Sequence, residues 1–376
     1  MTRPVARRRG WPMRAVMMGA LAALAGFDGA AARGLKSPFA ASPTLPAPSG
    51  PVRPCGVPPD PVRDIVIETS FKGGDYTKVD PERVRNRKAA TAPLHAYLDA
   101  VVRLSDEAMR ATGTPRRERQ ACAERWLTAW AEGDALLGTV SWPEGAYERK
   151  WTLVALSLAY LKMYGAELPP KPPPAVERWL RRLAEGVVNE YSGLSWKRNN
   201  HFYWAGLAAV AAGTVIDDRG IYAWGLGQYD QAMGQIRPDG SLPLELARGP
   251  LALYYHSYSA SPLSMTLAFR VANGAGGDDA PLRRLVHLVL RGLSDPSVLA
   301  DLAGGARQTW WAGGAPDGRT LAWLEAYRFA TGDRAADGWI ASLRPLGIVW
   351  LGGDLTHALG VSLPAVEPLK SPLGGP

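Results

Sequence analysis

The chain has 376 residues, of which 47% are hydrophobic and 21% are charged, and it carries a formal net charge of +8. This composition provides enough apolar material for one large core or two modest ones and excludes an intrinsically disordered chain. Half of the net charge lies in residues 1–32, which hold five arginines and one aspartate. The rest is weakly basic without a long basic run, which argues against nucleic-acid binding but suits a cleft that attracts a polyanion.

The first 32 residues have the pattern of a secretory signal peptide. A basic start precedes a short apolar stretch from Ala15 to Phe27 and an alanine-rich end. A membrane anchor would need about 20 apolar residues, and Asp28 interrupts this stretch too early. We therefore expect residues 1–32 to be removed on export. The mature protein is then periplasmic or secreted and has no contact with the membrane.

Residues 33–62 are rich in proline, alanine and serine and are predicted to form an extended leader without regular structure. Within it lies Cys55, and the second of the two cysteines is Cys122. An even number of cysteines in an oxidising compartment favours a disulfide between them. The alternative is two unpaired thiols, because Cys122 falls in a helical stretch. No Cys/His spacing indicates zinc, and nothing implies a metal or another cofactor.

The segment "ETSFKGGDYTKVDPERVRNRK", residues 68–88, is polar, charged and rich in glycine. It is either a solvated linker or a mobile lid that carries Lys72, Tyr76 and Lys78 over a cleft. From about Thr91 onward, apolar residues recur with helical spacing and stop at glycine or proline. The spacing predicts helices of roughly 15–20 residues, joined in pairs by short loops, and therefore an all-α chain. We expect an incomplete (α/α) toroid, or barrel, over residues 63–364, with a deep cleft, an N-terminal lid loop at about 68–88 and a tail at 365–376.

Two polar clusters interrupt the helical pattern. In "KRNNHFYW", residues 197–204, one asparagine is expected to cap a helix, with Asn199 the better candidate, while the other residues face a ligand. In "LELARGPLALYYHSY", residues 244–258, Gly249 and Pro250 predict an irregular segment before an apolar helix that starts near Pro262. The alternative is that its tyrosines pack in the core and His256 is a cap.

Both clusters match one family. "NNHFYW" (199–204) together with "LPLELARGPLALYYHSYSASPLSMTLAFRVANG" (242–274) resembles the alginate lyases of polysaccharide lyase family 5, the mannuronate-specific lyases. Supporting likeness lies in "PCGVPPDP", "ERWLTAWAEGDALL", "RKWTL", "AWLEAYRF" and "LGGDLT", so the resemblance covers about residues 55 to 356. It implies an enzyme that cleaves a uronate polymer by β-elimination and leaves 4,5-unsaturated uronate ends.

The resemblance also implies roles for four residues. Removal of the weakly acidic C5 proton requires donors that stabilise charge on the C6 carboxylate, and these are assigned to Asn200 and Arg248 with help from His201. Tyr255 is the expected acid, and the base is either Tyr255 or His201. A tyrosine base would need Arg248 to lower its pKa. We place Lys72, Tyr76, Arg149, Trp151, Asn199, Trp204 and Tyr258 in the substrate-binding set.

Two departures from the family pattern bear on the substrate. Ser70 occupies the position of a functional lysine, with Lys72 two residues further on, and "RGPL" at 248–251 replaces an arginine-rich run. Fewer fixed cations weaken the grip on a densely anionic chain. Polyglucuronate, hyaluronate or a glucuronate-containing exopolysaccharide is therefore the alternative to polymannuronate (alginate).

Other functional classes make different demands on the sequence. A hydrolase would need two carboxylates that flank the bond, for which Glu245 and Asp239 are the candidates. A non-catalytic polysaccharide-binding component of an export system would not need Asn200, His201 and Arg248 together with Tyr255. The paired tryptophans in "ARQTWWAGG", residues 306–314, form either a rim platform or core. The expected partner is an anionic polysaccharide, bound by a monomer.

Overall fold

The computed structural model describes residues 34–39, 54–75, 77–165, 171–194, 198–276 and 279–364. The predicted signal peptide, the predicted tail and Tyr76 lie outside these ranges. Nearly all regular structure in the described part is helical, which confirms the expected all-α class. The elements are α1 Pro81–Arg110, α2 Gly113–Glu132, α3 Glu144–Tyr164, α4 Pro174–Ser192, α5 Asn200–Val215, α6 Arg219–Gln235, α7 Pro243–Leu246, η1 Gly249–Leu251, α8 Ala252–Ala272, α9 Ala280–Ser294, α10 Ser297–Leu302, η2 Trp311–Gly313, α11 Trp323–Thr331, η3 Arg334–Ala336, α12 Asp337–Leu343, β1 Gly347–Ile348, η4 Val349–Leu351, β2 Gly353–Asp354 and α13 Leu355–Leu359.

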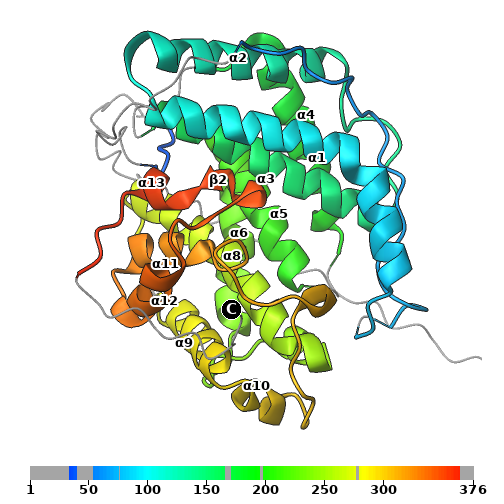
Figure 1. Cartoon of the computed structure of the whole chain (residues 1–376), viewed down its shortest axis with the longest axis vertical. Helices are drawn as coiled ribbons and strands as arrows, with labels where there is room; N and C mark the ends of the chain where they lie inside the picture. The colour runs from blue at the N-terminus through cyan, green and yellow to red at the C-terminus, as the bar shows by residue number, and fades with distance from the viewer. Residues whose placement is uncertain are drawn as a thin grey trace, which may run out of the picture. The chain divides into compact units, whose positions relative to one another are not determined.

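The helices form two layers (Figure 1). In the inner layer α1, α3, α5, α8 and α11 contact one another in series, and α2, α4, α6 and α9 cover them from outside. Helices α3, α5 and α8 are apolar on most faces because they are enclosed by neighbours. Helices α4 and α9 bury one stripe and expose the other, as expected for outer helices. This arrangement is the (α/α) toroid predicted from the sequence.

The C-terminal segment bridges the open side of the inner layer. Strand β1 pairs antiparallel with β2, while η4 contacts α1 and α3 and α13 contacts α11. The buried amine of Lys162 donates to the Gly352 carbonyl and to the carboxylate of Asp106. A side chain at Gly353, where φ is +98°, would meet both Asp106 and the Lys162 amine. Only glycine therefore fits at this point.

Residues 54–67 contain no helix, as predicted for the leader, but they are firmly attached to α2. Cys55 and Cys122 form a disulfide with a Cα–Cα distance of 5.6 Å, which confirms the predicted bridge. The indole N–H of Trp126 donates to the Gly56 carbonyl at 3.0 Å, and that of Trp130 donates to Pro59 at 2.9 Å.

The expected loop at 68–88 is wrong at its C-terminal end. Helix α1 begins at Pro81, so the irregular segment ends at Asp80. The carboxylate of Asp80 accepts from the N–H groups of Glu82 and Arg83, and proline suits the first helical position because its missing N–H has no helical partner there. The first turns of α1 carry charged side chains like those of a solvated loop, so the sequence pattern did not predict a helix there.

The expected start of a helix near Pro262 is also wrong. Helix α8 begins at Ala252 and continues through Pro262, so the tyrosine-rich segment is helical and only Arg248 remains in an irregular connection. His256 is buried, accepts from the Leu242 N–H at 3.0 Å and contacts the Ala252 carbonyl at 2.7 Å. It is a structural histidine. Among the described helices, none combines the length and apolarity needed to cross a membrane.

We predict that Cys122→Ser lowers the free energy of unfolding by about 2–4 kcal/mol, because the disulfide closes a long loop in the unfolded chain. Urea unfolding of the variant and of wild type with and without dithiothreitol measures this. Dithiothreitol should shift the midpoint of wild type and leave that of the variant unchanged. Equal midpoints for oxidised wild type and variant would contradict the prediction.

Candidate active site

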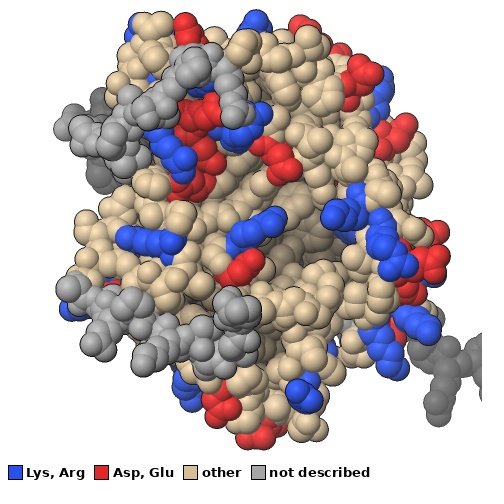
Figure 2. Space-filling view, viewed as in Figure 1, with Lys and Arg blue, Asp and Glu red and all other residues tan. Residues whose placement is uncertain are grey.

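One face of the molecule is hollowed by a cleft with a volume of about 390 Å³. Figure 2 shows this hollow with lysine and arginine side chains on both sides. Residues from α1, α3, α5 and α8, from the loop around η2 and from η4 line it. Much of the lining is aromatic, as suits sugar rings: Phe71, Tyr147, Trp151, Trp204, Tyr254, Tyr258, Trp310, Trp311, Trp323 and Trp350.

The first turn of α5 holds the "NNH" motif. The Asn199 side chain accepts from the His201 N–H at 3.1 Å, which confirms Asn199 as the N-cap. Asn200 is fully buried and does not line the cleft. Its backbone N–H donates to Glu245 at 2.8 Å, and its amide nitrogen donates to both oxygens of that carboxylate at 3.0 and 3.2 Å. The Asn200 amide thus binds the Glu245 carboxylate and does not lie in the cleft, where it was expected to stabilise the C6 carboxylate of a substrate.

His201 lines the cleft from the same turn. Its ring stacks on Tyr147 with a centroid distance of 3.5 Å and an interplanar angle of 7°. Its Nδ1 lies 3.1 Å from the amine of Lys150. One face and one nitrogen of the imidazole are thus held by α3, and the ring is presented to the cleft.

Arg248 and Tyr255 meet on the opposite side of the cleft. The Arg248 guanidinium lies 4.3 Å from the centroid of the Tyr255 ring and 3.7 Å from the Glu245 carboxylate. Burial raises the pKa of Tyr255 above its usual value, and the opposing effect of Arg248 is smaller. Arg248 therefore lowers the pKa of Tyr255 as expected, but the pKa as a whole lies above its usual value because desolvation outweighs this effect.

Three residues of the predicted substrate-binding set line the cleft: Trp151, Trp204 and Tyr258. The Trp204 and Tyr258 rings are 5.3 Å apart, and Trp151 meets Tyr258 edge-on at 6.3 Å. The tryptophans of the "WW" pair also line it, and Trp311 contacts Phe71 at 5.5 Å. Trp311 is half-buried and fits the rim-platform interpretation, whereas Trp310 is buried in the hydrophobic core, as the alternative interpretation expected.

Three described residues of the set do not line the cleft. Arg149 forms an ion pair with Glu190 on α4, because it points away from the cleft face of α3 that carries Trp151. Lys72 is exposed and is not part of the cleft lining, whereas Ser70 and Phe71 are. Neither cation reaches the place expected of it in this structure. Asn199 is buried in its capping role.

A charged cluster between α1 and α3 was not predicted from the sequence. Arg87 binds Glu144 and Glu148, and the second oxygen of Glu148 lies 3.2 Å from Nε2 of His95. All four line the cleft. The helical spacing of Arg87 and His95, and of Glu144 and Glu148, could have revealed it, but Arg87 lay in a segment predicted to be a loop.

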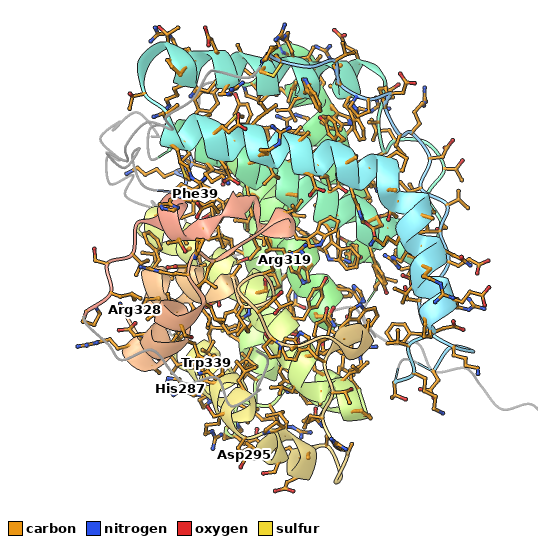
Figure 3. The ribbon with its side chains drawn as sticks, viewed as in Figure 1. Phe39, His287, Asp295, Arg319, Arg328 and Trp339 are labelled. Carbon is orange, nitrogen blue, oxygen red and sulfur yellow. A yellow bond between two sulfur atoms is a disulfide. The ribbon has the colours of Figure 1, made fainter. Side chains whose placement is uncertain are left out.

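Arg319 is a second residue that was missed. It is exposed at the cleft, on the loop before α11, and Figure 3 shows it near the middle of this face. The labelled His287 and Asp295 lie apart from it, by α9 and α10. No periodic pattern marks a single arginine in a loop, so only the fold brings it to the cleft.

A helical toroid with an aromatic cleft that also carries arginines suits a protein that acts on an anionic polysaccharide. The Alginate lyase family model matches residues 73–299. A polysaccharide lyase of Stenotrophomonas maltophilia is 32% identical over 84% of this chain and 93% of its own length, and an alginate lyase of Azotobacter vinelandii is 33% identical over 85% and 87%. The chain belongs to the alginate lyase family.

Solved structures agree with this fold. Alginate lyase A1-III from Sphingomonas species A1 superposes with a TM-score of 0.65 at 24% identity, covering 85% of this chain and 89% of that one. A tyrosine-to-phenylalanine variant of A1-III complexed with a tetrasaccharide gives a TM-score of 0.70 over 83% of this chain and 88% of that one, also at 24% identity. The toroid is therefore that of A1-III.

We predict that Asn200→Ala lowers the free energy of unfolding by about 1–3 kcal/mol, because the buried Glu245 carboxylate loses an amide donor. Asn199→Ala is the matched control. It removes only the cap and should cost about 1 kcal/mol. Urea unfolding of both variants measures the difference, and an Asn200→Ala variant as stable as wild type would contradict the role given to this amide.

Proposed function

We propose that the chain depolymerises a uronate polysaccharide by β-elimination, with polymannuronate (alginate) as its substrate. The observation that carries the proposal is the presence of Arg248, His201 and Tyr255 in one aromatic cleft. Two kinds of evidence support the substrate class. Relatives over most of the chain are named alginate lyases, and A1-III variants were crystallised with a tetrasaccharide.

The C6 carboxylate of the cleaved residue binds between Arg248 and His201 in this proposal. Both are donors, so both stabilise the extra negative charge that develops on the carboxylate when C5 loses its proton. An arginine remains charged at every relevant pH and therefore neutralises without giving up a proton. Asn200 contributes indirectly, by holding Glu245 next to Arg248.

Tyr255 performs both proton transfers. On mannuronate the C5 hydrogen and the departing O4 lie on the same face of the ring, so one phenol group reaches both. The phenolate takes the C5 proton, the electron pair of the C5–H bond forms the C4–C5 double bond, and the C4–O4 bond breaks. The phenol then returns the proton to O4 of the leaving sugar, which balances the reaction.

A glucuronate-containing polymer is the second candidate. The cleft wall formed by α1 and α3 offers no unpaired cation here, because the Arg87 guanidinium is bound by two carboxylates, those of Glu144 and Glu148. In the "RGPL" segment Leu251 is buried against Phe71 and Tyr255 instead of supplying a cation. A substrate in which neutral sugars alternate with uronates would meet this wall without charge repulsion.

We also propose that the protein works outside the cytoplasm, as a monomer, after removal of residues 1–32. The support is the signal-like pattern of those residues together with the Cys55–Cys122 disulfide, a bond that persists in oxidising compartments. Mass spectrometry of the protein from the culture medium and the periplasm would find a chain that starts near residue 33. A full-length cytoplasmic chain would refute this location.

Mixing the mature protein with polymannuronate, polyguluronate, polyglucuronate and hyaluronate tests the reaction. We expect the ultraviolet absorbance of the unsaturated uronate to rise with polymannuronate and to remain flat with Tyr255→Phe. Tyr222→Phe, a buried tyrosine outside the cleft, is the matched control and should retain activity. A rise only with polyglucuronate or hyaluronate would favour the second candidate, and no rise with any polymer would refute the lyase.

The pH dependence tests the tyrosine base. Burial raises the pKa of Tyr255, so below that pKa the phenolate fraction grows about tenfold per pH unit. We therefore expect kcat/KM to rise continuously from about pH 6 to about pH 9, since an unperturbed phenol already titrates near 10. A plateau near neutral pH would instead indicate an imidazole base. Circular dichroism across the range controls for unfolding.

A further inference from the structure

Lys150 is a buried lysine on α3 that the mechanism above does not use. Its side chain is completely inaccessible to solvent. Three acidic groups act on it over a distance. Of these, Glu144 and Glu148 are paired with Arg87, and Glu190 is paired with Arg149. A buried amine without its own carboxylate is costly, so its surroundings must compensate in another way.

The compensation comes from aromatic rings and two hydrogen bonds. The Lys150 amine lies 4.0 Å from the ring centroid of Tyr147, 4.8 Å from that of Trp151 and 5.2 Å from that of Tyr191. Ring faces attract a cation, and this attraction is strongest where water is excluded. The amine also lies 2.9 Å from the Tyr191 hydroxyl and 3.1 Å from Nδ1 of His201.

Lys150 donates to His201 in either of its protonation states. As an ammonium it has no lone pair, so Nδ1 must accept. Burial lowers the pKa of Lys150 and raises that of Tyr191, so a neutral amine faces a protonated phenol. A neutral amine still has two N–H groups, of which one donates to the Tyr191 hydroxyl and the other to Nδ1. Proton exchange on Lys150 leaves the direction of the bond to His201 unchanged.

We infer that Lys150 is a positioning residue that holds His201 as the neutral tautomer protonated on Nε2. Nδ1 is occupied as an acceptor, and a second proton there would place two donors against each other. The ring therefore presents an N–H to the cleft. In the proposed reaction, on which this meaning rests, His201 donates to the C6 carboxylate and cannot take the C5 proton.

Stacking on Tyr147 does not determine which nitrogen of His201 carries the proton. It fixes the plane of the imidazole, but either nitrogen could carry the proton in that plane. His256 shows the opposite outcome in the same fold. It accepts a backbone N–H at Nε2 and contacts the Ala252 carbonyl at Nδ1, so it must be protonated on Nδ1. The partner of one nitrogen decides the tautomer in both cases.

The charges around this pair come from three helices. They are Arg87 on α1, Glu144, Tyr147 and Glu148 on α3, and Glu190 and Tyr191 on α4. Arg87 binds Glu144 and Glu148, and Arg149 binds Glu190. Each of these carboxylates thus has a guanidinium partner, while the Lys150 amine lies directly against Nδ1 of His201.

Nitrogen NMR of the mature protein labelled with ¹⁵N-histidine tests the inference without any substrate. The chain contains five histidines, and a His201→Gln variant assigns the His201 signals. Long-range proton–nitrogen spectra should show His201 protonated on Nε2 and His256 protonated on Nδ1. His201 should remain neutral from about pH 6 to about pH 9, a range that includes the titration midpoint of an ordinary imidazole, near 6.5. A wild-type His201 protonated on Nδ1, or one that becomes imidazolium across this range, would overturn the inference.

Lys150→Met tests the cause. The methionine fills the cage without a donor, so His201 should show mixed tautomers and gain a second proton on acidification. We expect kcat to fall by about 10–100-fold with little change in KM, as for other partners that orient a catalytic group. Lys162→Met, which removes an equally buried lysine from the same helix, should lower stability but leave the His201 signals unchanged.

These results separate the two proposals. Unchanged His201 signals in folded Lys150→Met would refute the role of Lys150 even if the protein is an active lyase. If no polymer is cleaved but His201 has the expected tautomer, the proposed function fails and the positioning role stands. Should Lys150→Met not fold, the wild-type spectrum alone decides the tautomer, with His256 as the internal reference.

Discussion

The buried carboxylate of Glu245 is the contact on which the geometry of the cleft depends. A carboxylate removed from water must be met by donors, and here they are the backbone N–H and amide of Asn200 and, at 3.7 Å, the guanidinium of Arg248. These contacts join the first turn of α5 to the short helix α7 and to the irregular connection before α8. Because Arg248 lies over the ring of Tyr255, the relative positions of these two residues, to which we assign carboxylate binding and proton transfer, follow from one buried charge.

The double layer explains why polar groups are concentrated at one place. Inner helices enclosed by neighbours accept almost only apolar side chains along their length, so the residues that bind an anionic sugar gather at helix ends and on the side that faces the cleft. The exceptions are individually compensated. Lys150 is surrounded by rings, and Arg87 is bound by two carboxylates. Buried charges are thus retained only where aromatic rings or opposite charges contact them.

Several features were predictable because their physics is local. The N-cap at Asn199 follows from an asparagine before an apolar run, and the inner and outer helices follow from periodicity. The two wrong helix starts have different origins: the charged residues at the start of α1 were taken as part of a loop, and Pro262 was taken as a helix boundary. Pro81 is indeed at a first turn, but Pro262 lies inside a helix whose other contacts maintain it. Rules based on neighbouring residues in the sequence do not include the tertiary contacts that keep such a helix intact.

By itself the sequence determined the helical class, the capping residue and the family, and it favoured the pairing of its two cysteines, because these depend on spacing, composition and motifs along the chain. Only the tertiary structure decided which polar residues share the cleft. Arg149, Lys150 and Trp151 are consecutive, yet one pairs with α4, one holds His201 and one lines the cleft, since successive residues of a helix point in different directions. The pKa of Tyr255 likewise depends on burial by residues distant in sequence, because a sequence motif does not show how far folding removes a side chain from water.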